Sequence, residues 1–423
     1  MRNIIILGAG FAGLRTVLKL EKSGLPDPPW SIILVDKNSY QTYTASLYEA
    51  ASAYRWKGIL DIQKFEEALG GSVCLPMFEI LRGKNITLVR GVVQGVDFWN
   101  NEVKLESGDS IPYEYLVFAL GSETIYYGIP GAEKCCYALK TLEDSFRIRR
   151  RLEDIFSQAK KGEAIRIVIV GGGATGVEAI SEIAIYSRHL AKDHGLDYGD
   201  VHISLLEARD TILASNPRSQ REGVVRRLKS LGVEILTNTR VQEVLPDCVL
   251  FEGGDLPAGR QGKCDADIVL WGGGTKGLSL LGEIKGLEPS DKGFIGVDKF
   301  LQAKGLRKVF AIGDNAAFVD EATGNSAPAT AFIAGQQADT VSKNIIRALS
   351  GQPLLEYKVS IPGYVISCGG KYAVARAFGV TFSGFFGWAV KKLIDLKYFL
   401  SVLSFRKALT LWFRELRLFT KND

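Results

Sequence analysis

The chain has 423 residues, which is enough for about three domains of ordinary size. Hydrophobic residues make up 46% of it and charged residues 23%, a balance that supports a buried core. The 46 glycines are clustered and not periodic, which excludes a collagen-like or low-complexity chain. The formal net charge of +5 is small for this length and gives little support to a nucleic-acid-binding function.

The cysteine and histidine content argues against metal sites and disulfide frameworks. Six cysteines include no CxxC pair, and three histidines offer little material for a metal centre. We therefore expect no metal and a reducing compartment. A β-strand expected from Asn3 argues against a signal peptide. No uninterrupted apolar run of about 18 residues predicts a membrane-spanning helix.

The N-terminal segment has the pattern of a strand, a glycine turn, a helix and a second strand. Residues 3–7 are a β-branched run that leads into Gly8-Ala-Gly-Phe-Ala-Gly13. Apolar residues at helical spacing follow, and a buried strand at residues 31–36 ends on Asp36. The sequence therefore predicts a compact βαβ unit here.

Two regions predict antiparallel strands separated by polar turns. One covers residues 88–120 and ends with the apolar run at residues 115–120. The other covers residues 233–270 and closes on the run at residues 268–271, after turns rich in glycine. Their similar positions in the chain indicate two matching halves.

A second βαβ pattern lies between these two regions. Residues 166–170 form its first strand, and the turn Gly171-Gly-Gly-Ala-Thr-Gly176 follows. Its next strand, residues 201–207, ends on Glu207. Because this strand comes late, we expect the intervening helix to extend through residues 186–190.

Both glycine turns have the GxGxxG spacing of dinucleotide-binding folds. The first glycine allows a tight turn, the second lets the backbone approach a pyrophosphate, and the third lets the helix pack on the strand. The helix N-terminus adds N–H donors and the positive end of a dipole. Each turn is followed by a strand that ends on an acid, as this fingerprint requires. Two such sites predict FAD as a bound cofactor and a nicotinamide nucleotide as an exchanging carrier.

The two sites can be assigned from the residues that complete them. The N-terminal unit is expected to bind FAD, because a later short strand at residues 309–314 ends on Asp314 and can complete that site. The Glu207 carboxylate would bind ribose hydroxyls and repel a 2′-phosphate. It therefore favours NADH over NADPH, and the nearby Arg209 moderates this preference.

These motifs resemble the two-dinucleotide flavoprotein superfamily. The resemblance is carried by both glycine turns, by Tyr115-Leu-Val-Phe-Ala-Leu-Gly121 and by Phe310-Ala-Ile-Gly-Asp314. Within the superfamily the chain resembles the type II NADH:quinone oxidoreductases. The segments of that closer resemblance are residues 128–133, 139–144, 271–274 and 331–336.

The resemblance implies an α/β fold with two Rossmann-like dinucleotide-binding domains and a C-terminal amphipathic helical segment that docks on a membrane. It implies electron transfer from NADH through FAD to a membrane quinone by a ping-pong hydride mechanism, without proton pumping. The expected parts are an FAD domain from residues 1–160 and 286–350, an NADH domain at 161–285, and a membrane-anchoring segment at 351–423.

The resemblance also implies the site residues. Glu178 would relay protons to the quinone, although an acid that satisfies the helix dipole explains it equally well; Gln336 is the second catalytic residue. The expected cofactor-binding residues are Gly8, Gly10, Gly13, Asp36, Gly121, Asp314, Gly171, Gly173, Gly176, Glu207 and Gly273. The expected quinone pocket consists of Ala331, Phe332, Ala334, Gly335 and Gln336.

The chain departs from the family pattern at the expected quinone pocket. The family has AQxAxQ around residues 331–336, and this chain has Phe332 at the place of the first glutamine. A phenylalanine cannot donate a hydrogen bond to a quinone carbonyl. The segment at residues 40–47 also lacks the proline and leucine that commonly follow the acid of the FAD site.

Other functions remain open at this point. A disulfide reductase is excluded, because its CxxxxC motif would lie shortly after Asp36 and no cysteine precedes Cys74. A sulfide:quinone oxidoreductase could use Cys135 or Cys136 with Cys368 near the flavin. A soluble NADH:acceptor reductase and an NADH-sensing flavoprotein that acts through partner binding are further alternatives.

The C-terminal segment is aromatic, rich in leucine and basic. Residues 382–423 contain eight basic and three acidic residues, so this segment carries the whole net charge. Aromatic and basic residues on amphipathic helices predict docking on an anionic membrane surface, here on the cytoplasmic face of the cell membrane. The alternative is a helix pair packed on the core or on a second subunit, and a homodimer is possible.

Overall fold

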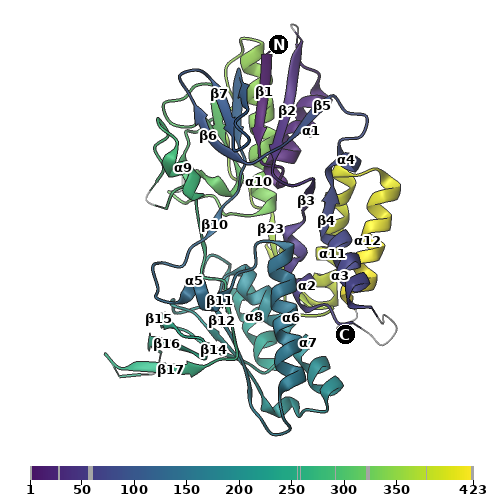
Figure 1. Cartoon of the computed structure of the whole chain (residues 1–423), viewed down its shortest axis with the longest axis vertical. Coiled ribbons are helices and arrows are strands. Elements are labelled where there is room, and N and C mark those ends of the chain that lie inside the picture. Colours follow the sequence, from purple (N-terminus) through teal and green to yellow (C-terminus); the bar gives the residue numbers. More distant parts are fainter. Residues whose placement is uncertain are drawn as a thin grey trace. The chain divides into compact units, whose positions relative to one another are not determined.

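The computed structural model describes residues 2–26, 29–55, 61–254, 256–257, 259–290, 292–320, 324–377 and 379–420 (Figure 1). The chain divides into two compact units. The first comprises Met1–Thr42, Leu75–Glu123 and Thr275–Ile361, and the second Tyr43–Cys74, Thr124–Gly274 and Pro362–Asp423. The domain limits expected from the sequence stay a prediction. In the structure, the residues around 43–74 and the C-terminal segment group with the second unit.

The first unit is built on a five-stranded sheet of parallel strands in the order β21-β9-β1-β2-β5. Its central strand β1 is buried on both faces, because Ile4, Ile5, Ile6 and Leu7 are all 0% exposed. A strand covered on both faces needs a continuous apolar run, which residues 4–7 supply. The strands are β1 (Arg2–Leu7), β2 (Trp30–Asp36), β5 (Ile86–Arg90), β9 (Tyr115–Phe118) and β21 (Val309–Ala311).

Helices α1 (Phe11–Ser23) and α10 (Ala331–Leu349) pack against each other in this unit. The remaining elements here are short. They are β3 (Tyr40–Thr42), α4 (Met77–Ile80), β6 (Val93–Asp97), β7 (Glu102–Leu105), β8 (Ser110–Pro112), β19 (Thr275–Lys276), α9 (Ser279–Glu283), β20 (Ile295–Gly296), η3 (Gly313–Asn315) and β22 (Ala316–Ala317). Strands β4 (Cys74–Pro76) and β10 (Glu123–Thr124) lie where the chain passes between the units.

The antiparallel strands expected at residues 88–120 are only partly correct. Strands β6, β7 and β8 do form an antiparallel sheet. The run at residues 115–120 does not join it, because β9 pairs in parallel with β1 and β21. Leu116, Val117 and Phe118 are fully buried, and an apolar run of this kind fits the centre of a parallel sheet better than a half-exposed hairpin.

The second unit repeats this plan with a parallel sheet in the order β11-β18-β12-β13-β14. Side chains of the central strand β12 alternate between two apolar clusters: Ile167 and Ile169 belong to one, and Val168 and Val170 to the other. The sheet therefore has a buried face on each side. Its strands are β11 (Cys136–Tyr137), β12 (Ile165–Val170), β13 (Val201–Leu206), β14 (Val233–Leu236) and β18 (Ile268–Trp271).

The antiparallel strands expected at residues 233–270 need the same correction. Strands β15 (Thr239–Val244), β16 (Cys248–Gly253) and β17 (Gln261–Asp265) are antiparallel. Strand β18 instead pairs in parallel with β12 and β11. Its residues are all buried, as expected for a strand inside a parallel sheet that is covered on both faces. The unit's helices and turns are η1 (Thr44–Ser46), α2 (Leu47–Ser52), α3 (Ile62–Val73), α5 (Ala132–Cys135), α6 (Leu142–Gln158), α7 (Ala174–His194), η2 (Tyr198–Asp200) and α8 (Arg218–Ser230).

The C-terminal segment belongs to this second unit. Strands β23 (Gly363–Ser367), β24 (Ala373–Ala377) and β25 (Val380–Gly384) form an antiparallel sheet. Two helices follow, α11 (Phe385–Val402) and α12 (Phe405–Phe419), drawn in yellow in Figure 1. Helix α11 packs on β24, and α12 packs on α11 and α3. None of the described helices is long and apolar enough to cross a membrane.

Candidate functional site

The first glycine turn joins β1 to α1. Gly8 has φ +97°, and a β-carbon there would lie 2.3 Å from the carbonyl oxygen of Ala119. A β-carbon on Gly13 would lie 1.8 Å from the Gly8 oxygen, so helix and strand meet at backbone contact. At Gly10, by contrast, no described atom lies within 4 Å of such a carbon. The turn is thus closed toward the sheet and open at its middle glycine.

The carboxylate of Asp36 braces this turn at the end of β2. Its Oδ2 accepts a hydrogen bond of 2.7 Å from the backbone N–H of Ala9, and its Oδ1 accepts one of 2.8 Å from Asn38. Within the described chain, no side chain caps the N-terminus of α1. The positive end of the helix dipole therefore favours an anion here, beside the open Gly10.

Two buried amides that the sequence analysis missed fix the other edge of the same site. The Asn315 side chain accepts a hydrogen bond from the Gly121 N–H and donates to the carbonyl of Phe118. Gln337 accepts one of 2.6 Å from the Gly313 N–H. The half-buried Asp314 lies between Gly313 and Asn315. No spacing rule marks these amides, because each acts on a backbone group that only folding brings near.

The second glycine turn, between β12 and α7, repeats the first. Gly171 has φ +103°, and a β-carbon there would lie 2.4 Å from the Gly272 oxygen. On Gly176 it would lie 2.0 Å from the Gly171 oxygen, whereas Gly173 faces no described atom within 4 Å. Among the described side chains, none caps α7 at its N-terminus. The helix extends to His194, which confirms the long helix expected from the spacing.

Glu207 holds the edge of this second turn. Its Oε2 accepts a hydrogen bond of 2.7 Å from the Gly172 N–H, and its Oε1 accepts one of 2.8 Å from the Arg209 N–H. Gly273 lies across the turn, where the Tyr127 hydroxyl donates to its carbonyl at 3.0 Å. The predicted residues of each glycine turn are thus brought together within one unit.

Each turn fits the diphosphate of a dinucleotide. The middle glycines leave room that a β-carbon would fill, neither helix N-terminus is capped by a described side chain, and a fixed carboxylate stands at the end of the second strand. A dinucleotide at the first turn, expected to be FAD, would be held by Gly8, Gly10, Gly13, Asp36, Gly121 and Asp314. A nicotinamide dinucleotide at the second turn would be held by Gly171, Gly173, Gly176, Glu207 and Gly273.

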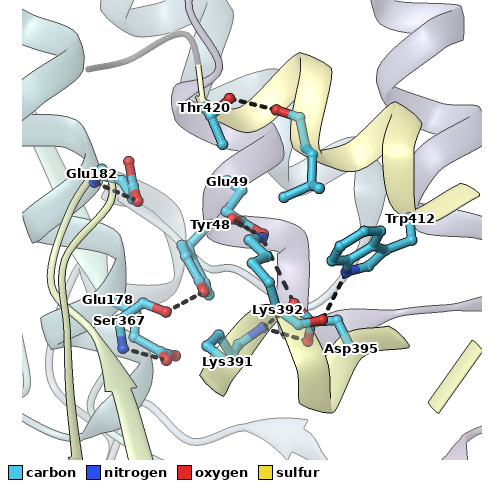
Figure 2. Close-up of polar contacts among 12 residues, drawn as sticks. Tyr48, Glu49, Glu178, Glu182, Ser367, Lys391, Lys392, Asp395, Trp412 and Thr420 are labelled. Carbon is cyan, nitrogen blue, oxygen red and sulfur yellow. Dashed lines mark hydrogen bonds and ion pairs between the residues drawn. The ribbon is translucent and has the colours of Figure 1, made fainter. Parts of the chain in front are cut away.

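Glu178 is the fifth residue of α7 and faces the C-terminal elements of its own unit (Figure 2). Its Oε1 accepts a hydrogen bond of 3.3 Å from the Ser367 N–H, and the Ser367 hydroxyl accepts one of 2.8 Å from Tyr48. Burial raises the pKa of Glu178 to about 7, against the opposing effects of Lys391 and of this hydrogen bond. A carboxyl group with this pKa can both hold and release a proton near neutrality.

The residues expected to line a quinone pocket differ in exposure. Ala331 is exposed and Phe332 is 50% exposed, whereas Ala334 and Gly335 are buried in α10. The Gln336 amide donates to the Ser360 carbonyl at 2.8 Å and accepts from the Ser360 N–H at 3.4 Å. Gln336 therefore fastens the segment around Ser360 to α10, and its catalytic role stays a prediction.

The cysteines considered for sulfide chemistry lie on opposite faces of one sheet. Cys136 packs in the cluster that contains Val168 and Val170, and Cys368 packs in the cluster that contains Ile167 and Ile169. Burial raises the pKa of Cys136 to about 12 and also raises that of Cys368. Both thiols are therefore protonated and poor nucleophiles, and the sheet separates them. This arrangement argues against the sulfide alternative.

The charge of the C-terminal segment is distributed differently from the expectation. The eight basic residues of this segment predict a cationic surface, but two of them, Lys391 and Lys392, are buried and paired with carboxylates. The acids Asp395 and Glu415 are also buried. The exposed bases in the described part are Lys397, Arg406, Arg414 and Arg417, and Lys407 is half-buried. Lys421 and Asp423 lie outside the described residues.

Sequence comparison gives the family. Residues 2–338 match the family model described as pyridine nucleotide-disulphide oxidoreductase. The chain belongs to this family. Membership confirms the expected α/β fold and the expected pair of cofactors, FAD and a nicotinamide dinucleotide, and it makes the chain an oxidoreductase.

Curated relatives have a more specific name. A type II NADH:quinone oxidoreductase from Staphylococcus haemolyticus (strain JCSC1435) is 27% identical over 402 residues, which is 94% of each chain. One from Staphylococcus aureus (strain NCTC 8325 / PS 47) is 28% identical over the same length and coverage. The resemblance to type II NADH:quinone oxidoreductases seen in the motifs is confirmed by these relatives.

Solved structures share the fold. NDH2 from Plasmodium falciparum in complex with NADH superimposes with a TM-score of 0.83 at 17% identity, and 99% of each chain is covered. The sulfide:quinone oxidoreductase from Aquifex aeolicus gives 0.76 at 18% identity, with 95% of this chain and 91% of the other covered. At these identities the likeness concerns the fold alone.

The geometry at Glu207 predicts how the oxidoreductase selects its nicotinamide dinucleotide. Replacement Glu207→Ser removes a fixed negative charge that would repel a 2′-phosphate. We expect the NADPH/NADH ratio of kcat/KM for flavin reduction to rise about tenfold, equivalent to about 1.4 kcal/mol. Asp210→Ser, which removes an exposed acid three residues later, is the matched control and should leave the ratio unchanged. An unchanged ratio in Glu207→Ser would refute this role.

Proposed function

We propose that this protein is an NADH:quinone oxidoreductase that works without pumping protons. The observation that carries the proposal is the pair of open glycine turns, one in each unit, in a chain whose relatives over 94% of its length are named type II NADH:quinone oxidoreductases. FAD bound at the first glycine turn would supply a hydride acceptor and a two-electron donor. Because NADH and the acceptor would react in succession, the kinetics should be ping-pong.

The chain's own residues would bind NADH, exclude NADPH and transfer protons. The α7 N–H groups and Gly173 would hold the NADH diphosphate, and Glu207 would exclude a 2′-phosphate. In this proposal protonated Glu178 gives its proton to the reduced quinone oxygen and regains one before the next turnover. Its pKa of about 7 suits this task at neutral pH. Ala331, Phe332, Ala334, Gly335 and Gln336 remain the proposed approach for the quinone.

Docking on the membrane would bring the enzyme to its lipid-dissolved acceptor. Helices α11 and α12 expose large apolar side chains beside exposed bases, the combination that binds the interface of an anionic membrane. We place this surface on the cytoplasmic face of the cell membrane. Its exposed apolar residues are Phe385, Phe386, Leu393, Ile394, Leu400, Phe405 and Phe413. A second copy of the chain on this surface is the competing explanation.

One assay tests the enzyme function directly. NADH should bleach the flavin absorbance of the holoenzyme anaerobically, and a soluble quinone should restore it. Absence of bleaching would contradict the dehydrogenase function. Bleaching that a quinone does not reverse would point to another acceptor or to the NADH-sensing alternative.

Glu178→Gln tests the proton step in the same assay. The amide keeps an oxygen for the Ser367 N–H but cannot give up a proton. We expect reoxidation by quinone to slow by about a hundredfold or more, without its former pH transition near 7, while bleaching by NADH is unchanged. Glu182→Gln, one helical turn further on, is the control, because Glu182 accepts from the Gly370 N–H. Equal effects of both replacements would refute the specific role of Glu178.

Vesicle binding tests the docking surface. Phe386→Ser combined with Phe413→Ser should weaken binding to phosphatidylglycerol vesicles by about a hundredfold, because each phenyl group contributes about 1.5 kcal/mol or more when buried. Higher salt should weaken the wild type too. Trp99→Ser is the control, since Trp99 is 94% exposed in the other unit. Unchanged vesicle binding with loss of a dimer would favour the competing explanation.

A further inference from the structure

Five charged residues are buried together where α11 and α12 meet α2. Asp395 and Glu415 are 0% exposed, and the others are below a tenth. Buried charges require partners of opposite sign, because removal from water costs several kcal/mol for each ion. The five, which we call the buried charge cluster, are Glu49, Lys391, Lys392, Asp395 and Glu415.

Both lysines of the buried charge cluster are already matched by carboxylates (Figure 2). Lys391 donates to the two oxygens of Asp395 at 2.7 and 2.9 Å, and Lys392 donates to Glu49 at 2.6 Å. Tyr43 gives Asp395 a further hydrogen bond of 2.6 Å. The two lysines are therefore neutralised by two carboxylates, and the fifth member of the cluster is an acid without a lysine of its own.

Glu415 is that fifth member. Both of its carboxyl oxygens are shielded from solvent, and neither finds a hydrogen-bond partner within the described part of the chain. An ionised carboxylate in this position would add an uncompensated negative charge beside Glu49 and Asp395. Burial raises the pKa of Glu415 well above its ordinary value; Lys392 opposes this shift, and Asp395 and Glu49 reinforce it.

Among the described residues, the elements that face Glu415 supply no further cation that would stabilise its ionised form. Helix α11 faces it with Lys391, Lys392 and Asp395, and α2 with Glu49. Tyr43 also faces this group. Burial raises the pKa of its phenol, the negative charges of Asp395 and Glu415 raise it further, and the phenol therefore stays neutral. On α12 itself, Arg414 turns away and donates to the Gly71 carbonyl of α3. Helix α3 otherwise meets the end of α12 through the apolar cluster of Phe65, Leu69, Val73, Leu418 and Phe419.

We propose that the folded chain carries one proton on Glu415, and that this proton holds α12 against α11 and α2. Opening of α12 would expose Glu415 to water, where it loses the proton at ordinary pH. A group whose pKa is higher in the closed state stabilises that state fully at low pH and loses this contribution as pH rises. Helix α12 should therefore open as the solution becomes alkaline. The link to membrane docking rests on the function proposed above.

Amide hydrogen exchange of residues 405–419 in the holoenzyme measures this opening. Corrected for intrinsic exchange, the opening constant of wild type should rise about tenfold per pH unit from pH 6, for one proton released. In Glu415→Gln, which keeps the shape without the proton, it should be independent of pH. Glu415→Met should behave in the same way if the Gln variant folds poorly. The control is Glu222→Gln on α8, an exposed acid that should keep the wild-type dependence. A wild-type opening constant independent of pH would overturn the proposal.

A second variant tests why the proton is there. Glu49→Gln leaves two carboxylates for two lysines, so that Glu415 can ionise as the partner of Lys392. In this background the tenfold dependence on pH should disappear, and Glu415→Gln should become destabilising. If the dependence persists unchanged, the charge balance of the cluster does not determine the proton.

Vesicles of phosphatidylcholine and phosphatidylglycerol connect opening to docking. Wild type should lose binding between pH 7 and 9, whereas Glu415→Gln should retain it. Equal loss in both would overturn the link between the proton and the docked helix. A wild type that fails to bind at pH 7 would instead contradict the membrane function, and the exchange measurement would still decide whether Glu415 holds a proton.

Discussion

The architecture depends on one kind of backbone contact, made once in each unit. A β-carbon on Gly13 would lie 1.8 Å from the Gly8 oxygen, and one on Gly176 would lie 2.0 Å from the Gly171 oxygen. Only glycine permits this approach, and it brings the N-terminus of a helix directly over the end of a strand. The open middle glycine, the positive end of the helix dipole and the strand-terminal carboxylate all take their places from it.

The glycine turns could be predicted from the sequence because their chemistry is local. The residues that make the contact are five positions apart, and the acid that braces each turn follows one helix later. The strand pairing was harder. Residues 115–118 and 268–271 have the pattern of last strands of antiparallel regions. Each instead pairs in parallel with a strand more than a hundred residues earlier, β1 in the first unit and β12 in the second. Hydrophobic pattern alone does not give the direction of a partner.

The charged residues of the C-terminal segment show a second limit. Lysine is usually exposed, and a basic, aromatic sequence gives no indication that Lys391 and Lys392 turn inward. Glu49, the partner of Lys392, lies 343 positions away from it, so no local pattern could reveal this pair. The same reason hides Asn315 and Gln337, whose amides bind backbone groups distant in sequence. The sequence therefore identifies residues whose side chains can bind or react, but only the folded structure shows which of them hold other groups of the protein in place.

The Trp412 side chain adds a constraint on α12 that concerns rotation. Its indole N–H donates to the carbonyl of Lys392 at 2.7 Å, which directs this side of the helix toward α11. Successive residues of an α-helix are offset by about 100° around its axis. Phe413, the next residue, is therefore carried away from α11 and is 60% exposed. One directional bond thus sets the angular orientation of the helix, which decides the side chains that any partner of α12 would meet first.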